Sequence, residues 1–109
     1  MEKILNELKE LSNVTRDDIV ERELKIIKDE IKRCIDFNWT EFTHRMSGIG
    51  SGTIKRYGLF NMFKEYLPNK EVLKIVELLN ECGYQSEVVE VGTLAGAWWF
   101  RISIKFKGL

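Results

Sequence analysis

The sequence predicts a small α+β domain, in which helices pack on an antiparallel sheet that contains a C-terminal β-hairpin. Residues 97–107 alternate between apolar and polar side chains, which is typical of a strand with one face on a core. Residues 16–37 and 70–82 instead repeat apolar side chains every three to four positions, which is typical of helices. A length of 109 residues suits one modest core, so we expect a single domain over 1–109.

An N-terminal helical hairpin is expected over residues 1–37. Apolar side chains at positions 4, 5, 8 and 11 form one stripe of a short first helix. Thr15 is a suitable N-cap for a second helix that begins at Arg16, because Asp17 and Asp18 follow in its first turn. The apolar stripe of this second helix is Val20, Leu24, Ile27, Ile31 and Cys34. The stripe packs on the first helix or forms the seam of a homodimer.

Residues 38–67 are predicted to be irregular or helical. Trp39, Phe42 and Met46 lie at helical spacing, which favours a short helix, although the same stretch also fits a strand. Three glycines then require a turn or a mobile loop over 47–52. Residues 53–67 carry apolar side chains on one helical side, which favours a helix, with a short strand over 53–57 as the alternative.

A further helix is expected at the start of residues 68–109. Pro68 ends the element before it, because a proline disfavours the helical conformation of the preceding residue. Asn69 is then a suitable cap for a helix over 70–82 that is apolar on nearly every side. Gly83 fits the left-handed conformation that commonly ends a helix.

Two antiparallel strands follow that helix. The first is expected over 84–91 with Val89 and Val91 inward, and residues 92–96 connect it to the strand over 97–107. The inward face of the second strand is Trp98, Phe100, Ile102, Ile104 and Phe106. Because two strands alone are marginal in water, the hairpin needs covering helices, a third strand or a second chain.

The formal net charge is zero, from 17 basic and 17 acidic side chains, so no overall charge draws the protein toward nucleic acid or anionic lipid. The charges are nevertheless uneven. Residues 42–67 carry four basic side chains against Glu65, and residues 91–109 carry three with no acid. The sequence contains neither an apolar run long enough to span a membrane nor a secretion signal. We therefore expect a cytoplasmic protein without a membrane partner.

No pattern in the sequence indicates catalysis, a metal site or a cofactor. The segment GIGSGTIK, residues 48–55, lacks the spacing of a phosphate-binding loop and is expected to be a flexible connection or a loop that orders on a partner. His44 is the only histidine, expected at the surface or half-buried, and on a helix it could lie on the same face as Glu41. Cys34 and Cys82 are far apart, which favours buried reduced thiols over a zinc pair or a disulfide. We expect a protein that is not an enzyme.

Basic and aromatic side chains form the candidate binding surface. The outer face of strand 97–107 joins a tryptophan to several cations, and the rims of the glycine-rich loop add further cations and a tyrosine. Aromatic and arginine side chains dominate the energies of protein interfaces, and the same combination can stack on bases and hold phosphates. The residues assigned to this surface are Arg45, Lys55, Arg56, Tyr57, Trp99, Arg101 and Lys105.

Three functions are compatible with these observations. The favoured one is a non-enzymatic protein that docks on another macromolecule, first of all a protein, and modulates it through the candidate surface. Direct binding of nucleic acid through the same surface is the alternative, weakened by the dispersed cations of a neutral chain. The third is a structural homo-oligomer joined through the helix 16–37.

The charged helices at the start and the ending ELLNECGYQSEVVEV…AWWFRISIKF resemble small accessory proteins encoded by phages and mobile elements of low-GC hosts. The resemblance covers about a third of the chain. Proteins of that kind commonly occupy a surface of a host or defence protein, anti-CRISPR inhibitors among them. The resemblance therefore implies an inhibitor without shared catalytic residues. The neutral charge differs from the strongly acidic DNA mimics in this class.

Overall fold

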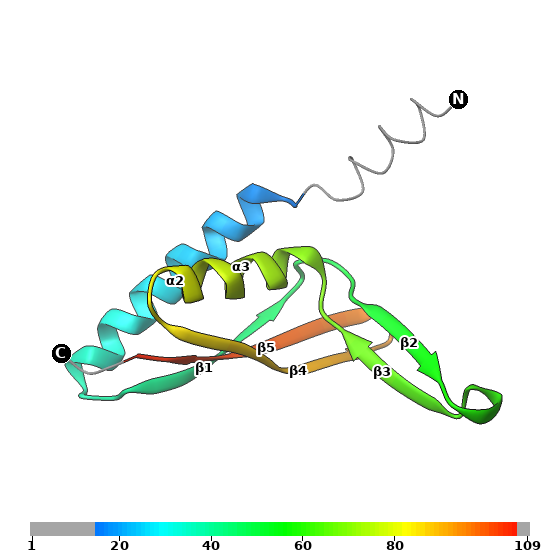
Figure 1. Ribbon diagram of the computed structural model, residues 1–109. Coiled ribbons are helices and arrows are strands. Elements are labelled where there is room, and N and C mark those ends of the chain that lie inside the picture. The colour runs from blue at the N-terminus through cyan, green and yellow to red at the C-terminus, as the bar shows by residue number, and fades with distance from the viewer. Residues whose placement is uncertain (1–14, 107–109) are drawn as a thin grey trace.

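A computed structural model describes residues 15–106 of the chain (Figure 1). Its elements are α2 (Asp17–Asp36), β1 (Glu41–Ser47), β2 (Thr53–Tyr57), the 3-10 turn η1 (Leu59–Asn61), β3 (Phe63–Leu67), α3 (Lys70–Glu81), β4 (Gln85–Leu94) and β5 (Ala97–Lys105). Strands β1, β5 and β4 form an antiparallel sheet in that order, and β2 pairs with β3 in a separate hairpin. The α+β class and the C-terminal hairpin are confirmed. The expected first helix lies outside the described residues.

Both helices lie on one face of the three-stranded sheet (Figure 1). The buried side chains between the layers are Val20, Ile27, Ile31, Cys34, Met46, Ile49, Val72, Ile75, Leu79, Phe100, Ile102, Ile104 and Phe106. The inward stripe of α2 is therefore buried within its own chain. A homodimer seam along that stripe would require the core to open.

Strand β5 is the centre of the sheet. The side chains of Phe100, Ile102 and Ile104 are completely buried, as their alternation predicts. Each such side chain contributes about 1.5–3 kcal/mol when it leaves water. Because the helices cover only this face, the alternate side chains of β5 lie on the uncovered face of the sheet.

The two helices begin in different ways. Asn69 caps α3 as predicted, since the backbone N–H of Val72 donates to its side-chain oxygen at 3.0 Å. The prediction of Thr15 as the cap of α2 is wrong. Its hydroxyl donates to Asp17 at 3.0 Å, and Arg16 occupies the capping position without a side-chain cap. The guanidinium of Arg16 hydrogen-bonds Asp18 and holds the pKa of that carboxyl below its ordinary value.

The predicted helix around Trp39 and Met46 is wrong, because these residues border or belong to strand β1. Phe42, His44 and Met46 point to the core in alternation and pair with Ile104, Ile102 and Phe100 of β5. Two of these apolar side chains are four positions apart, which is also a helical spacing. Pairing with β5 therefore decides the conformation, and the alternative of a strand is the correct one.

The predicted helix over 53–67 is also wrong, and the alternative of a strand over 53–57 is correct. Gly58 has φ 86°, and Phe60 and Asn61 have φ 56° and 55°, all in the left-handed region. These three residues turn the chain back on itself, so that β3 returns beside β2. The loop predicted over 47–52 is a connection over 48–52, because Ser47 still belongs to β1. Its Ile49 is nevertheless buried, which fixes the loop on the core.

Strand β4 is longer than predicted and contains a bulge. The register shifts between Val88 and Glu90, so Val89 is half exposed, and Val88 and Val91 pack on the core. The expectation of an inward Val89 is therefore wrong. The turn to β5 is also tighter than residues 92–96, because the strand continues to Leu94.

The two cysteines differ in their surroundings. Cys34 is buried and free, and its burial raises the pKa of the thiol, which keeps the side chain neutral. Cys82 is also free but exposed, so the expectation that both thiols are buried is wrong for this one. It follows α3 at the point where the chain turns toward Gly83, which has the predicted left-handed φ of 96°.

Replacement of the α3 cap tests the start of this helix. Asn69→Ala should lower the free energy of unfolding by about 1 kcal/mol, because the N–H of Val72 loses its acceptor. Asn69→Asp keeps an acceptor oxygen for Val72 but loses the amide that donates to the Ile49 carbonyl at 3.4 Å, so its loss should be smaller than that of Asn69→Ala. Urea unfolding followed by circular dichroism measures both. Equal losses for the two variants would contradict a capping role.

Candidate functional site

A two-stranded arm projects from the body of the protein (Figure 1). We define the arm as Thr53–Leu67, which comprises β2, η1 and β3. Its base is fixed by Trp98, whose ring meets Tyr66 edge-on at 6.1 Å and stacks on Phe100 at 6.3 Å. Gly52 allows this close approach, since a Cβ there would meet the Trp98 ring and the backbone oxygen of Leu67. The arm is thus tied to the core at its base only.

The outer end of the arm is apolar and exposed to solvent. We define the arm tip as Leu59, Phe60, Met62 and Phe63, whose exposed fractions are 74%, 87%, 73% and 57%. Phe63 stacks on Tyr57 at 5.6 Å, and the other three tip residues belong to the turn that follows Tyr57 and precedes Phe63. Four large apolar side chains held together in water are unusual for a monomer and are typical of an interaction site.

The cations of the arm lie directly behind the tip. Arg56 pairs across the hairpin with Lys64, and Lys55 pairs with Glu65. Directly opposite residues point to the same face of a hairpin, so Arg56 and Lys64 are neighbours while Lys55 has an acid beside it. Like charges in such a pair destabilise the hairpin unless a negative partner approaches.

The remaining four predicted residues lie on the open face, which we define as the face of the three-stranded sheet away from the helices. Trp99, Arg101 and Lys105 project there from β5, and Arg45 projects beside them from β1. Its guanidinium lies 5.6 Å above the Trp99 ring. The acids that the register places on the same face are Glu41, Glu87 and Glu90.

Glu90 neutralises part of the open face. Its carboxylate accepts a hydrogen bond from the Trp99 indole at 2.7 Å and lies 3.5 Å from the guanidinium of Arg101. The tryptophan and two of the three cations are thus engaged within the protein. Trp99 and Arg101 would exchange these contacts with Glu90 for those of any ligand bound to this face.

The seven predicted site residues are divided between two surfaces. Lys55, Arg56 and Tyr57 belong to the arm, and the other four belong to the open face. The sequence interpretation missed the arm tip, because its apolar spacing was assigned to a helix. Two signals in the sequence could have found it: a glycine within an apolar cluster, and the absence of acids from Phe42 to Lys64.

His44 is buried, so its predicted position near the surface and its pairing with Glu41 are wrong. The ring is only 5% exposed and lies between two carboxylates of α2. Its Nε2 is 3.1 Å from Glu23, which is also buried, and its Nδ1 is 3.2 Å from Glu30. Each ring nitrogen of His44 therefore has a carboxylate within hydrogen-bond distance. This group fastens α2 to β1 and is enclosed by the core.

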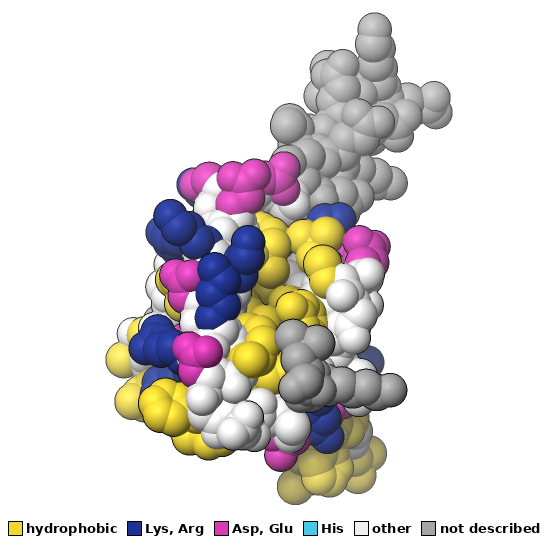
Figure 2. All heavy atoms as spheres, turned by 90° about the vertical axis from the view of Figure 1, so that its left-hand side faces the viewer, with side chains coloured by type: hydrophobic (Ala, Val, Ile, Leu, Met, Phe, Trp, Pro, Cys, Tyr) yellow, Lys and Arg dark blue, Asp and Glu magenta, His cyan; other side chains and the backbone are white. Residues whose placement is uncertain are grey.

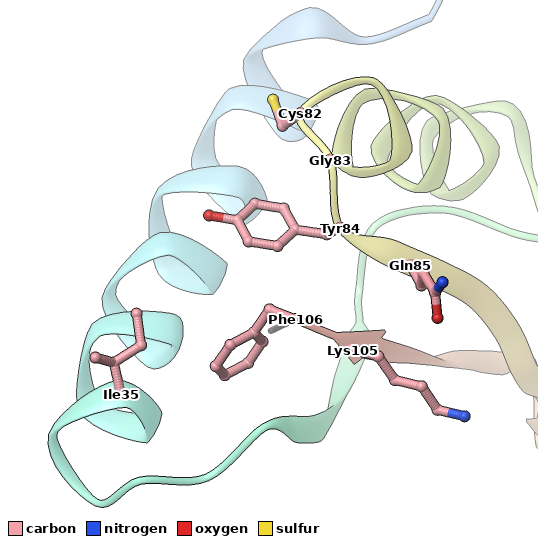
Figure 3. A pocket seen from close by; sticks show the side chains of 7 residues that line it. All are labelled: Ile35, Cys82, Gly83, Tyr84, Gln85, Lys105 and Phe106. Carbon is pink, nitrogen blue, oxygen red and sulfur yellow. The ribbon is translucent and has the colours of Figure 1, made fainter. Parts of the chain in front are cut away.

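A pocket of about 500 Å³ lies at the end of the molecule opposite the arm. Its lining is Ile35, Cys82, Gly83, Tyr84, Gln85, Lys105 and Phe106 (Figure 3). The rings of Tyr84 and Phe106 face Ile35, while the Cys82 thiol and the Lys105 amine point away from them. Figure 2 shows this end, where hydrophobic side chains gather beside the mixed charges of the helices. The Cys82 and Lys105 groups of the lining therefore do not converge on a common point.

Among residues 15–106, no group of three or more histidine, cysteine, aspartate or glutamate side chains is placed to hold a metal ion. In the same part of the chain, the helices are too short or too polar to cross a membrane.

Because His44 is buried, we expect substitutions of two glutamates on α2 to change the free energy of unfolding by different amounts. Glu23→Ala should lower the free energy of unfolding by about 1–3 kcal/mol, because a buried ring nitrogen of His44 loses its partner. Glu21→Ala, an exposed position two residues away, should change it by less than about 0.5 kcal/mol. Chemical denaturation measures both, and similar values would refute the fastening role of His44.

On the open face, we expect the cost of a substitution at Gly92 to depend on the presence of Trp99. A Cβ on Gly92 would overlap the Trp99 indole, so Gly92→Ala should cost about 1–3 kcal/mol of stability. The same change in a Trp99→Ala background should cost much less, because the ring is no longer there. Thermal unfolding of the four proteins gives the coupling energy. Additive losses would mean that Trp99 does not lie over Gly92.

Comparison with known proteins adds no family to these observations. No protein-family model, curated protein or solved structure matches the chain. We therefore infer its function from the geometry of its own residues.

Proposed function

We propose that this protein is a non-enzymatic binding protein that docks through the arm on a larger partner in the cell. The observation that carries the proposal is the arm tip, where four large apolar side chains are held in water at more than half exposure. Burial of such side chains on a partner is favourable, because each contributes about 1.5–3 kcal/mol when it is fully removed from water. Docking would bury the apolar surface that folding leaves exposed to water.

The backbone of the tip supports the same proposal. Phe60 and Asn61 both adopt left-handed φ angles, which cost an ordinary residue about 1–3 kcal/mol each. This conformation aims an aromatic side chain outward at 87% exposure instead of burying it. The left-handed angles close the hairpin turn, but the turn itself does not require an exposed phenylalanine, and strain of this kind is concentrated at functional sites.

A docking protein of this kind acts by occupying a surface. Inhibition of a host or defence component, which the resemblance to phage accessory proteins implies, is one way in which occupation modulates a partner. The open face supports this role less well than the arm, because Glu90 already engages Trp99 and Arg101. Nucleic-acid binding is also less well supported, since the predicted cations are divided between two surfaces.

A capture experiment with matched variants tests the docking role. Phe60→Ser together with Met62→Ser should remove most partner from immobilised protein exposed to a whole-cell extract that retains membranes, proteins and nucleic acids. Two lost contacts of this size weaken binding by more than about tenfold. Phe37→Ser, the same change at a phenylalanine that is 68% exposed after α2, should have no effect.

Unfolding midpoints of the variants control for stability. Retention of the same material by the wild type and the Phe60, Met62 variant would contradict docking through the arm. Loss with Phe37→Ser alone would move the docking site to the opposite end of the molecule.

A further inference from the structure

We propose that the surface on which the arm docks is an anionic lipid bilayer, with the arm tip inserted at the level of the headgroups. The inference rests on the proposed function, because it names the occupant of the same arm. It concerns insertion from one side, which does not require a helix that crosses the membrane.

The side chains of the arm are arranged in levels that follow the polarity of a bilayer. The outermost level is apolar and contains Leu59, Phe60 and Met62. Behind it lies the stacked pair of Tyr57 and Phe63, and one residue further back lie Arg56 and Lys64. Successive levels of a hairpin are about 3.4 Å apart. Hydrocarbon, interfacial aromatic rings and anionic phosphates succeed one another in the same order in a membrane.

The charge of the arm is complementary to an anionic surface. No acid occurs between Phe42 and Lys64, in a chain with 17 acids. The neighbouring cations Arg56 and Lys64 repel each other in the free hairpin, and phosphates beside them would remove that repulsion. Helix α2 begins with Asp17 and Asp18 and lies on the body of the protein, away from the tip (Figure 1). The acids there are thus kept away from a surface that the tip contacts.

The net charge of zero and the lack of a spanning segment led us to expect no membrane partner. Neither property prevents a projecting arm from binding a bilayer. At physiological ionic strength, charges act over about 8 Å, so a bilayer responds to the cations beside the tip more than to the distant body. The apolar side chains supply a contribution that does not depend on net charge.

The shape of the tip favours a bilayer over the other possible occupants. Leu59, Phe60 and Met62 belong to the turn at the projecting end of the arm and are at least 73% exposed, so an occupant must accommodate a protruding apolar surface. Lipids rearrange around any convex shape, whereas a protein would need a cleft already formed to match. Nucleic acid is bound through many phosphate contacts, and the arm has only three cations, one of them beside Glu65.

Sedimentation with vesicles tests the proposal on the full chain. One set of vesicles is phosphatidylcholine, and the other contains phosphatidylglycerol at about one third of the lipid. The wild type should sediment with the anionic vesicles. Phe60→Ser with Met62→Ser should lower the partition coefficient by at least about tenfold. Arg56→Gln and Lys64→Gln should each lower it by about fivefold on anionic vesicles only. Phe37→Ser is the matched control and should equal the wild type.

The outcomes separate this proposal from the docking role. Absence of wild-type sedimentation with anionic vesicles, or sedimentation that the Phe60 and Met62 changes leave unaltered, overturns the bilayer as occupant. Tip-dependent binding to a duplex oligonucleotide or to a soluble protein fraction, without vesicle binding, also overturns it but leaves docking through the arm intact. If the tip variant matches the wild type with vesicles and with whole-cell extract, both proposals fail.

Discussion

The fold depends on the burial of one face of β5 beneath two helices. Phe100, Ile102 and Ile104 form the centre of the core, and both other strands of the sheet reach that core by hydrogen-bonding to β5. Because α2 and α3 occupy the same side, the opposite side of the sheet remains open. Ion pairs and a cation over an indole ring make that side compatible with water.

One polar group within this apolar layer helps to define the position of α2. The hydrophobic effect drives α2 onto the sheet but is non-directional, whereas a hydrogen bond joins two particular atoms. His44 fixes α2 relative to β1 because its two nitrogens meet Glu23 and Glu30, which lie about two turns apart on the same side of α2. A buried polar network of this kind stabilises the fold only while each of its members has a hydrogen-bond partner.

The sequence alone predicts the structure correctly where a residue pattern is compatible with only one structural environment. The alternation in β5, the cap at Asn69 and the left-handed Gly83 were all correct for this reason. The sequence alone does not predict the structure correctly between Trp39 and Leu67. In β1 the spacing of Phe42 and Met46 fits a helix as well as a strand, and only the distant β5 decides between them. In the arm the apolar residues face solvent, so their spacing contains no information about a core.

The same limit applies to the candidate site. Each cation and aromatic residue of the predicted surface is identifiable from its type, but whether two of them share a surface depends on strand order. Trp99 and Lys55 lie in different sheets, and Glu90 joins Trp99 through a register that includes a bulge. A pattern without its pairing partners could not show that the open face is largely neutralised or that the arm stands apart.

The strand order also has a consequence for how the chain folds. The arm and the β4–β5 hairpin join neighbouring segments, whereas β1 pairs with β5 from Glu41 and Lys105 to Ser47 and Trp99. Contacts between distant segments form late, because closing a long loop costs entropy before any contact forms. During synthesis β1 must therefore wait for β5, with Phe42 and Met46 uncovered. Until β5 is made, the nascent chain exposes both the side chains of its future core and the apolar arm. Aggregation therefore competes with folding during this interval.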